Sequence, residues 1–173
     1  MLASTGIADK RKYLMVELYL CIGIVHQGMK FYYLKKKTWR TRDFDYTFDA
    51  IVYSVSVSLG FAIFENILYV YSYGLEVGIT RAFTAIPGHF FDAILMGIFY
   101  GAAMRQYYKG SPAPVYKFSL LCALAIPVFI HGTYDFFAMS PDYPTWVFYV
   151  YLASLYITCF WLVNVFSKRD RPI

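Results

Sequence analysis

The fold is decided by the stretch Gly60-Phe61-Ala62-Ile63-Phe64-Glu65-Asn66-Ile67-Leu68-Tyr69, which lies inside an apolar run that extends over residues 50–73. Glu65 is the only formally charged side chain between Asp49 and Glu76. A run of this length can cross a bilayer, and a carboxylate at its centre costs about 2.5–3.5 kcal/mol on insertion scales. Charged groups at that depth mark functional sites by default, so Glu65 is the first candidate functional residue.

The composition of the whole chain is that of a polytopic membrane protein. Of its 173 residues, 59% are hydrophobic, 21% are aromatic and 16% are charged, whereas a soluble domain carries about 25% charged residues. Five apolar segments are long enough to span a bilayer, and only helices let such runs satisfy their backbone in lipid. The sequence therefore predicts an all-α bundle of about five transmembrane helices, forming one domain over residues 1–173, with helices at about residues 13–34, 48–73, 81–107, 116–139 and 145–166.

The net charge of +5 is concentrated between or beyond the apolar segments, in basic clusters at residues 10–12, 35–42, 105–117 and 168–171. Cytoplasmic loops of membrane proteins are enriched in Lys and Arg. If all five segments cross, the last three clusters share one side, which we predict to be cytoplasmic; the cluster at residues 10–12 counts against this orientation. The composition implies the lipid bilayer as a partner. Nucleic-acid binding is not predicted, because no aromatic–basic motif accompanies the charge.

Two later apolar segments also carry polar residues, His89 with Asp92 and His131 with Asp135. Residues three or four apart share a helix face, so each pair forms one polar stripe. We expect these stripes and Glu65 to face one cavity inside the bundle, away from lipid. Proline residues at positions 87 and 127 predict kinks a few residues before each histidine.

The chemistry of these groups leaves several hypotheses open. A carboxylate one turn away can orient an imidazole, as Asp135 would orient His131, and Glu65 would serve as a general base. The same groups would also serve as structural polar contacts between helices or as a proton relay in a transporter. A divalent metal such as zinc is a further hypothesis, and its ligands would come from His26, Glu65, His89 and His131.

Three motifs closely resemble the signature of the PrsW family of intramembrane proteases. They are DAIVYSVSVSLGFA with ENILY (residues 49–62 and 65–69), RAF leading to His89 and then MG (residues 81–83 and 96–97), and HGTYDF (residues 131–136). The resemblance extends from about residue 23 to the end of the chain. It implies hydrolysis of a membrane-embedded protein substrate, such as an anti-sigma factor, in a bacterial plasma membrane. It also implies kinship with CAAX prenyl proteases, which use glutamate and histidine to activate water.

The chain departs from the family at its first motif, where a Glu-Glu pair followed two residues later by Lys is replaced by His26-Gln27-Gly28-Met29-Lys30. The family's helices before this motif are also expected but not seen. The chain is therefore a natural variant without activity, an altered and shortened sequence, or an enzyme in which His26 shares work with Glu65. The resemblance implies catalytic residues Glu65, His89, His131, Asp135, His26 and Gln27. The alternative function is a non-catalytic membrane binder of a substrate helix or lipid, that is, a pseudoprotease.

Overall fold

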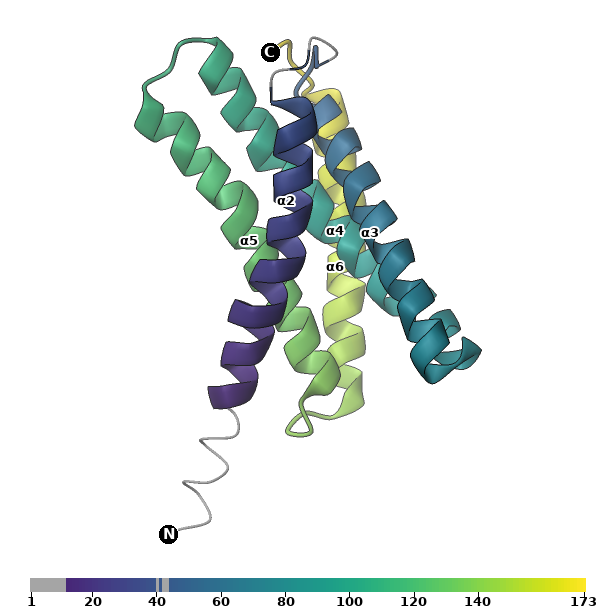
Figure 1. The fold of residues 1–173 in the computed structure, drawn as a ribbon. Helices are drawn as coiled ribbons and strands as arrows, with labels where there is room; N and C mark the ends of the chain where they lie inside the picture. Colours follow the sequence, from purple (N-terminus) through teal and green to yellow (C-terminus); the bar gives the residue numbers. More distant parts are fainter. Residues whose placement is uncertain (1–11, 40, 42–43) are drawn as a thin grey trace.

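The computed structural model describes residues 12–39, 41 and 44–173 and is built from helices (Figure 1). The first span starts at Lys12 and passes through a π-helix, η1 (Val16–Gly23), into α2 (Ile24–Thr38). The others are α3 (Asp49–Tyr73), α4 (Leu75–Tyr108), α5 (Ala113–Met139) and α6 (Thr145–Lys168). Within the described residues, five helices are long and apolar enough to cross a membrane. The predicted all-α bundle is confirmed; of the predicted basic cluster at residues 10–12, only Lys12 lies within the described part of the chain.

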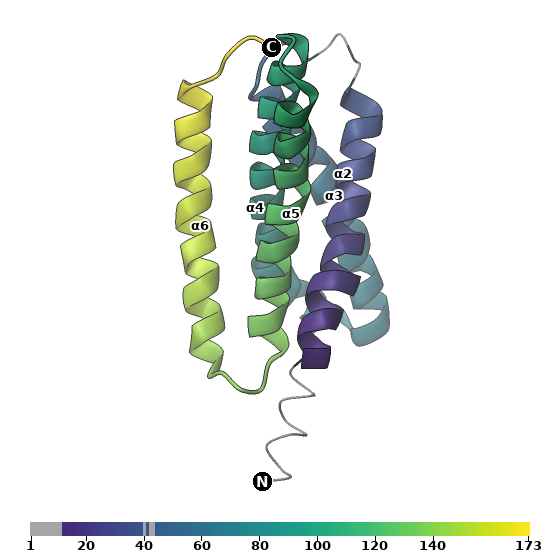
Figure 2. The same ribbon diagram turned by 90° about the vertical axis from the view of Figure 1, so that its left-hand side faces the viewer.

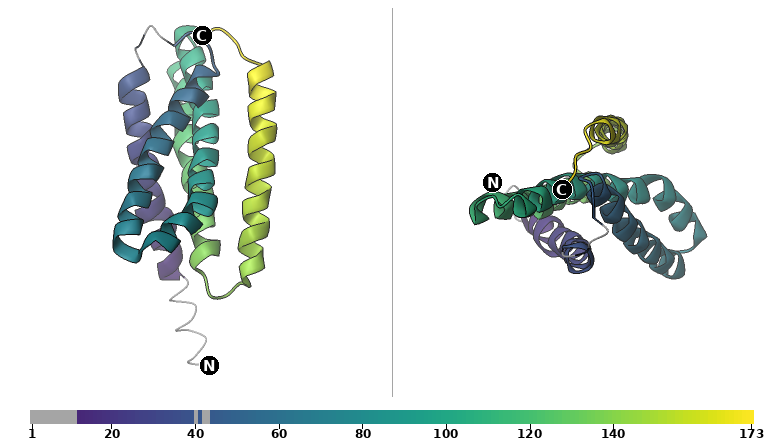
Figure 3. Two further views of the ribbon diagram at one scale, coloured as in Figure 1. Left: turned by 90° about the vertical axis from the view of Figure 1, so that its right-hand side faces the viewer. Right: turned by 90° about the horizontal axis from the view of Figure 1, so that it is seen from above.

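Helix α4 is the centre of the bundle. Seen from the side, α4 and α5 stand between α2 and α6, which occupy opposite flanks (Figure 2). The view from above shows the same order, with α6 apart on one side and α2 and α3 on the other (Figure 3). In the most apolar 18-residue stretch of α4, 50% of the residues are buried, against 17% in the corresponding stretch of α6. Polar groups on α4 are therefore the ones best shielded from lipid.

The connection between α3 and α4 differs from the prediction. The predicted helices end at residue 73 and resume at residue 81, yet Gly74 alone makes the reversal and α4 begins at Leu75, six positions before the predicted start. Gly74 has φ 91°, which glycine adopts without steric penalty, and its N–H bonds to Val70 O at 2.9 Å. The predicted boundary was wrong because one such residue suffices to reverse the chain. Arg81 consequently lies inside α4, six residues after its start.

Helices α3 and α4 approach each other closely near their other ends. A Cβ on Gly97 would lie 2.5 Å from the Cα atom of Ile51, and a Cβ on Gly101 would lie 2.7 Å from the carbonyl oxygen of Thr47. Such distances are incompatible with a side chain, so these two glycines permit the contact. The close packing fixes α4 against α3 and thereby fixes the register between the residues of the two helices.

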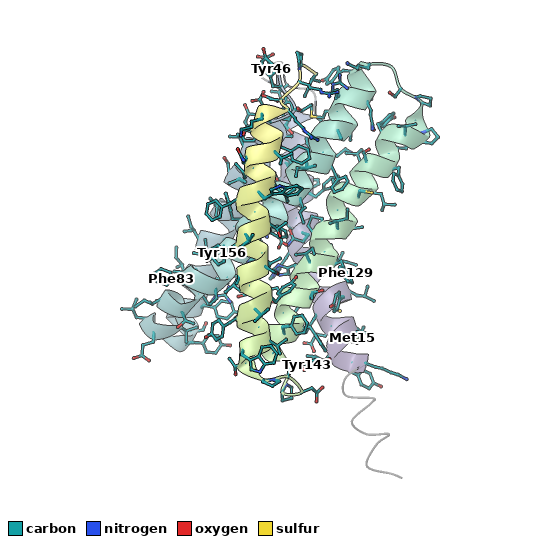
Figure 4. All side chains as sticks on the ribbon, turned by 180° about the vertical axis from the view of Figure 1, so that it is seen from behind. Met15, Tyr46, Phe83, Phe129, Tyr143 and Tyr156 are labelled. Atoms are coloured by element: carbon teal, nitrogen blue, oxygen red, sulfur yellow. The ribbon has the colours of Figure 1, made fainter. Side chains whose placement is uncertain are left out.

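The two internal prolines do not interrupt their helices. Helix α4 continues through Pro87 and α5 continues through Pro127. Pro87 cannot donate to the carbonyl of Phe83 four residues earlier, and the hydroxyl of Tyr156 on α6 donates to that oxygen instead, at 2.9 Å. Figure 4 labels both residues where α6 crosses α4. The freed carbonyl therefore serves helix packing against α6.

The described residues of three predicted basic clusters gather at one end of the bundle, and Arg40 and Arg42 lie outside the described part of the chain. The C-terminal residues cross to the start of α3, where Thr47 N donates to Arg171 O at 2.9 Å and Ile173 N donates to Asp45 O at 3.0 Å. The end of α4 reaches the end of α2 through Tyr108 Oη, which donates to Trp39 O at 3.2 Å. The shared side agrees with the predicted orientation, and its assignment to the cytoplasm stays a prediction.

Candidate functional site

The first part of the site is the Glu65 cluster, which consists of Glu65, Arg81, His89 and Lys30. Glu65 on α3 uses one carboxylate oxygen for Arg81 Nη2 at 3.0 Å and the other for His89 Nε2 at 2.9 Å, both from α4. The opposite ring nitrogen of His89, Nδ1, lies 2.9 Å from Lys30 Nζ of α2. An ammonium group can only donate, so His89 accepts at Nδ1 and donates from Nε2 to Glu65. These contacts fix both the tautomer and the ring orientation of His89.

The arginine of this cluster is held from a second direction. The guanidinium carbon of Arg81 lies 3.6 Å from the ring centroid of Tyr69, one turn along α3 from Glu65. Tyr69 lies four residues after Glu65 and so shares its helix face, and the arginine contacts both of them. A guanidinium stacked on a ring and paired with a carboxylate has little freedom to move. The Glu65 carboxylate is therefore clamped in one orientation.

The second part is the Asp92 cluster, which consists of Gln27, Asp92, His131, His26 and Asp135. One oxygen of Asp92 accepts hydrogen bonds from Gln27 Nε2 at 2.6 Å and from His131 Nδ1 at 2.9 Å. The other nitrogen of His131 lies 3.3 Å from His26 Nδ1 and 3.4 Å from Asp135 Oδ2. Helices α2, α4 and α5 therefore meet through side chains at the level of Asp92.

Both clusters line one cavity of about 100 Å³ inside the bundle. The rings of His89 and His131 stack at its wall, with centroids 5.3 Å apart. A water molecule needs about 10–15 Å³ of such space, so the cavity has room for several waters or for one water and a peptide carbonyl. Its acidic, basic and imidazole lining residues are His26, Glu65, Arg81, His89, Asp92, His131 and Asp135.

The structure brings all six predicted site residues together. Five of them line the cavity, and Gln27 lies behind it and bonds to Asp92. The pairing of His131 with Asp135 was predicted as its orienting contact, but the shorter contact is with Asp92 of another helix. Spacing along one helix cannot reveal a partner on a second helix. Lys30 and Arg81 were also not predicted as site residues, although each is a charged group within or beside an apolar segment.

Three residues of the site form a group that could hold a metal ion. His89, Asp92 and His131 are all buried, and each offers a ligand atom within 4.8 Å of the others. The group shares His89 and His131 with the predicted ligand set and contains Asp92 in place of His26 and Glu65. Two imidazoles and one carboxylate match the donor set of catalytic zinc sites. Gln27 Oε1, beside Asp92, is buried without a hydrogen-bond partner among the described residues, as expected next to an added ligand.

Comparison with known proteins agrees with this site. Residues 3–163 match a family described as PrsW family intramembrane metalloproteases. The chain belongs to the PrsW family. It is 32% identical over 139 residues to Protease PrsW of Geobacillus kaustophilus, which is 80% of this chain and 58% of that relative. It is 31% identical over 155 residues to Protease PrsW of Bacillus subtilis, which is 90% of this chain and 67% of that relative.

A further PrsW relative, from Clostridioides difficile, is 32% identical over 151 residues, or 85% of this chain and 60% of the relative. The chain thus spans roughly three fifths to two thirds of the length of these relatives. No solved structure matches the chain. The five membrane-length helices of its described residues and its bacterial relatives identify an integral protein of the bacterial plasma membrane.

Proposed function

We propose that this PrsW family chain hydrolyses a peptide bond of a membrane-embedded protein. The observation that carries the proposal is the cavity inside the bundle, lined by carboxylates and imidazoles from four helices. Water is scarce in the bilayer core, so a peptidase that works there must supply a polar chamber of its own. The catalytic roles that follow are part of the same proposal.

Glu65 is the proposed general base. Its carboxylate lines the cavity and its side chain keeps 15% of its surface accessible, so a water molecule can reach it. The clamp formed by Arg81 and His89 holds the carboxylate in a fixed direction. A base that is already oriented accepts the proton of the attacking water without first reorganising, and general-base catalysis typically contributes about 10²–10⁴-fold to a rate.

His131 is the proposed electrophilic group and proton donor. Asp92 holds its Nδ1 atom, which leaves Nε2 directed toward His26, Asp135 and the cavity. A proton on Nε2 would stabilise the negative charge that develops on the carbonyl oxygen, and it would then pass to the departing amine. Asp135 and His26 face the same nitrogen and would set how readily it carries that proton.

The donor set fits a divalent metal such as zinc, and His89, Asp92 and His131 are the residues that would hold it. When bound, such an ion supplies a Lewis acid and lowers the pKa of a coordinated water. Metal ligands must be deprotonated, so His89 and His131 would hold such an ion as neutral imidazoles and Asp92 as a carboxylate.

The pair His26-Gln27 is expected to make this chain a slow enzyme. The resemblance implies two glutamates at these positions, and the amide of Gln27 cannot act as a base. The amide of Gln27 donates to Asp92 at 2.6 Å, so a carboxylate there would oppose Asp92 unless a proton or a cation lay between them. The Gln27 amide therefore holds the Asp92 carboxylate in place without a metal ion, and the site depends less on such an ion.

A non-catalytic binder is the second candidate function, and Gln27 is the observation that favours it. An amide that completes the Asp92 cluster preserves the shape of the site without contributing a base. Such a chain would hold a substrate helix or lipid without cutting it. For either function we propose a single-pass membrane protein as the substrate class, with an anti-sigma factor as the example that the family resemblance implies.

The test is a cleavage assay in liposomes that contain a single-pass anti-sigma factor. We expect slow cleavage by the chain as it stands and a gain on the order of 10²-fold in the double variant His26→Glu with Gln27→Glu. Glu76→Gln, an exposed substitution near the start of α4, is the matched control and should leave both rates unchanged. Co-purification of intact substrate with both versions would establish the binder; rapid cleavage by the unaltered chain would show that His26-Gln27 is a working pair.

A further inference from the structure

A second cavity, of about 260 Å³, lies where the ends of α3, α4 and α6 meet the C-terminal residues. The helix ends that form it lie at the top of the bundle in Figure 1, beside the C-terminus, and its lining includes no residue of the Glu65 or Asp92 clusters. Arginines from two distant parts of the chain line it, together with apolar side chains. The polar lining consists of Arg105, Arg169, Arg171, Gln106 and Thr47, and the apolar lining consists of Phe48, Ile51, Ile98, Ala102 and Phe166.

The arginines are brought together by the crossing of the C-terminal residues. Arg105 lies one turn before the end of α4 and donates from Nε to Pro172 O at 3.3 Å. Arg171 is held through its backbone, which pairs with Thr47 in both directions. Ile173 packs against a buried cluster that includes Phe44 and Tyr100, so the crossing is anchored. Three arginines thereby line one cavity, with the backbone of Arg171 and the side chain of Arg105 held in place.

The nearby acids form no ion pairs with these arginines among the described residues. Asp170 Oδ1 accepts hydrogen bonds from Thr47 Oγ1 at 3.1 Å and from the backbone N–H groups of Phe48 and Arg171 at 2.8 and 3.0 Å. Asp49 Oδ2 accepts from two backbone N–H groups just before α3. Both carboxylates therefore serve the start of α3. Among the described residues, Arg105, Arg169 and Arg171 have no ion pair with a carboxylate.

The floor of the cavity is apolar and continues into the membrane-spanning part of the bundle. Ile51 and Ile98 are partly or fully buried in the cluster that joins α3, α4 and α6, and Phe48 and Phe166 pack against the same cluster. A soluble anion would use the arginines and leave this floor exposed to water. An amphiphile would use both surfaces, with its charged group at the arginines and its chain along the floor.

We propose that this cavity binds an anionic phospholipid. Guanidinium groups pair with phosphate oxygens in a bidentate manner, and basic pockets between transmembrane helices on the cytoplasmic side bind anionic lipid headgroups. The bound lipid connects α6, which is otherwise the least buried flank of the bundle, to α3 and α4. This inference is independent of the proteolytic function, because none of its residues belongs to the catalytic cavity.

The test is native mass spectrometry of the full chain in detergent, titrated with phosphatidylglycerol or with phosphatidylcholine that has the same acyl chains. We expect one phosphatidylglycerol per chain and binding of phosphatidylcholine that is weaker by at least about tenfold. The triple variant Arg105→Gln, Arg169→Gln, Arg171→Gln should lose at least about tenfold in affinity for phosphatidylglycerol. Inorganic phosphate, added as a competitor, should fail to displace the lipid at equal concentration.

Two variants serve as controls for charge and for folding. The triple variant Lys35→Gln, Lys36→Gln, Lys37→Gln removes the same charge from the exposed end of α2 at the same end of the bundle and should retain the affinity. Ala102→Phe fills the floor, keeps every charge and should lose lipid binding. Equal losses in the two triple variants, displacement by phosphate, or full binding by Ala102→Phe would each overturn the proposal; thermal melting confirms that every variant is folded.

Discussion

The Glu65 and Asp92 clusters share one cavity but hold their carboxylates in different ways. Glu65 keeps 15% of its side-chain surface accessible and gives each oxygen to a separate donor, one of them a full cation. Asp92 keeps 2% and concentrates two hydrogen bonds from neutral or titratable groups on one oxygen. A carboxylate that water can reach is suited to chemistry, whereas one that joins three helices is suited to structure and to holding a ligand. We therefore test the Glu65 cluster through the cleavage rate and the Asp92 cluster through the stability of the fold.

The largest expected effect belongs to Glu65 and appears in the rate. In the chain with both glutamates restored at positions 26 and 27, Glu65→Gln should lower cleavage by about 10²–10⁴-fold, because the amide cannot accept the proton of water. The folded state should also lose some stability, because the amide offers a single acceptor where Arg81 and His89 both donate to the carboxylate. Cleavage of the single-pass substrate and thermal melting in detergent measure the two effects. A rate that survives Glu65→Gln would remove Glu65 from the role of base.

The next effect belongs to Asp92 and appears in stability. Asp92→Ala should lower the free energy of unfolding by about 3–5 kcal/mol, because it leaves the buried amide of Gln27 and the imidazole of His131 without their partner. Asp135→Ala is the matched control: its carboxylate lies farther from His131, at 3.4 Å, and keeps 19% of its surface accessible. We expect a clearly smaller loss there, measured by denaturant unfolding in detergent. Equal losses would contradict the structural role given to Asp92.

These contrasts also show what the sequence can predict. The five spans follow from segment length and composition, and the convergence of Glu65, His89 and His131 follows because lipid excludes polar side chains from the outer faces. The boundary near Gly74 was wrong because hydropathy does not report that one left-handed residue can join two helices. The link between Asp92 and His131 was not predicted because it depends on the register of α4 against α5.

A third effect concerns metal affinity. Gln27→Ala removes a hydrogen bond to a candidate ligand, and loss of such supporting contacts typically costs about 10–100-fold in metal affinity. Zinc binding by the purified chain, followed by competition with a chelator, measures the change. Gln106→Ala is the matched control, because that amide accepts from Ser119 outside the catalytic cavity. Unchanged affinity in Gln27→Ala, or equal changes in both variants, would place the metal elsewhere.

The smallest expected effect belongs to Ser58, which bonds to the backbone of His89 in the Glu65 cluster. Ser58 Oγ donates to the backbone carbonyl of His89 at 2.9 Å and is buried between α3 and α4. Hydrogen bonds between membrane helices contribute about 0.6 kcal/mol on average, because the alternative states also find partners for the same groups. Ser58→Ala should therefore lower the free energy of unfolding by about that amount and slow cleavage by less than about threefold.

Ser56 supplies the matched control for this last effect. It lies on the same helix, is exposed, and its hydroxyl donates to Val52 O within its own helix at 2.8 Å. Ser56→Ala removes the same hydroxyl without touching α4, so neither stability nor rate should change measurably. A loss of stability in Ser58→Ala as large as that in Asp92→Ala would contradict this expectation. It would show that the Glu65 cluster depends on the Ser58 hydrogen bond as strongly as the Asp92 cluster depends on its carboxylate. The two halves of the cavity would then be one cooperative network, and the assignment of chemistry to one and structure to the other would be wrong.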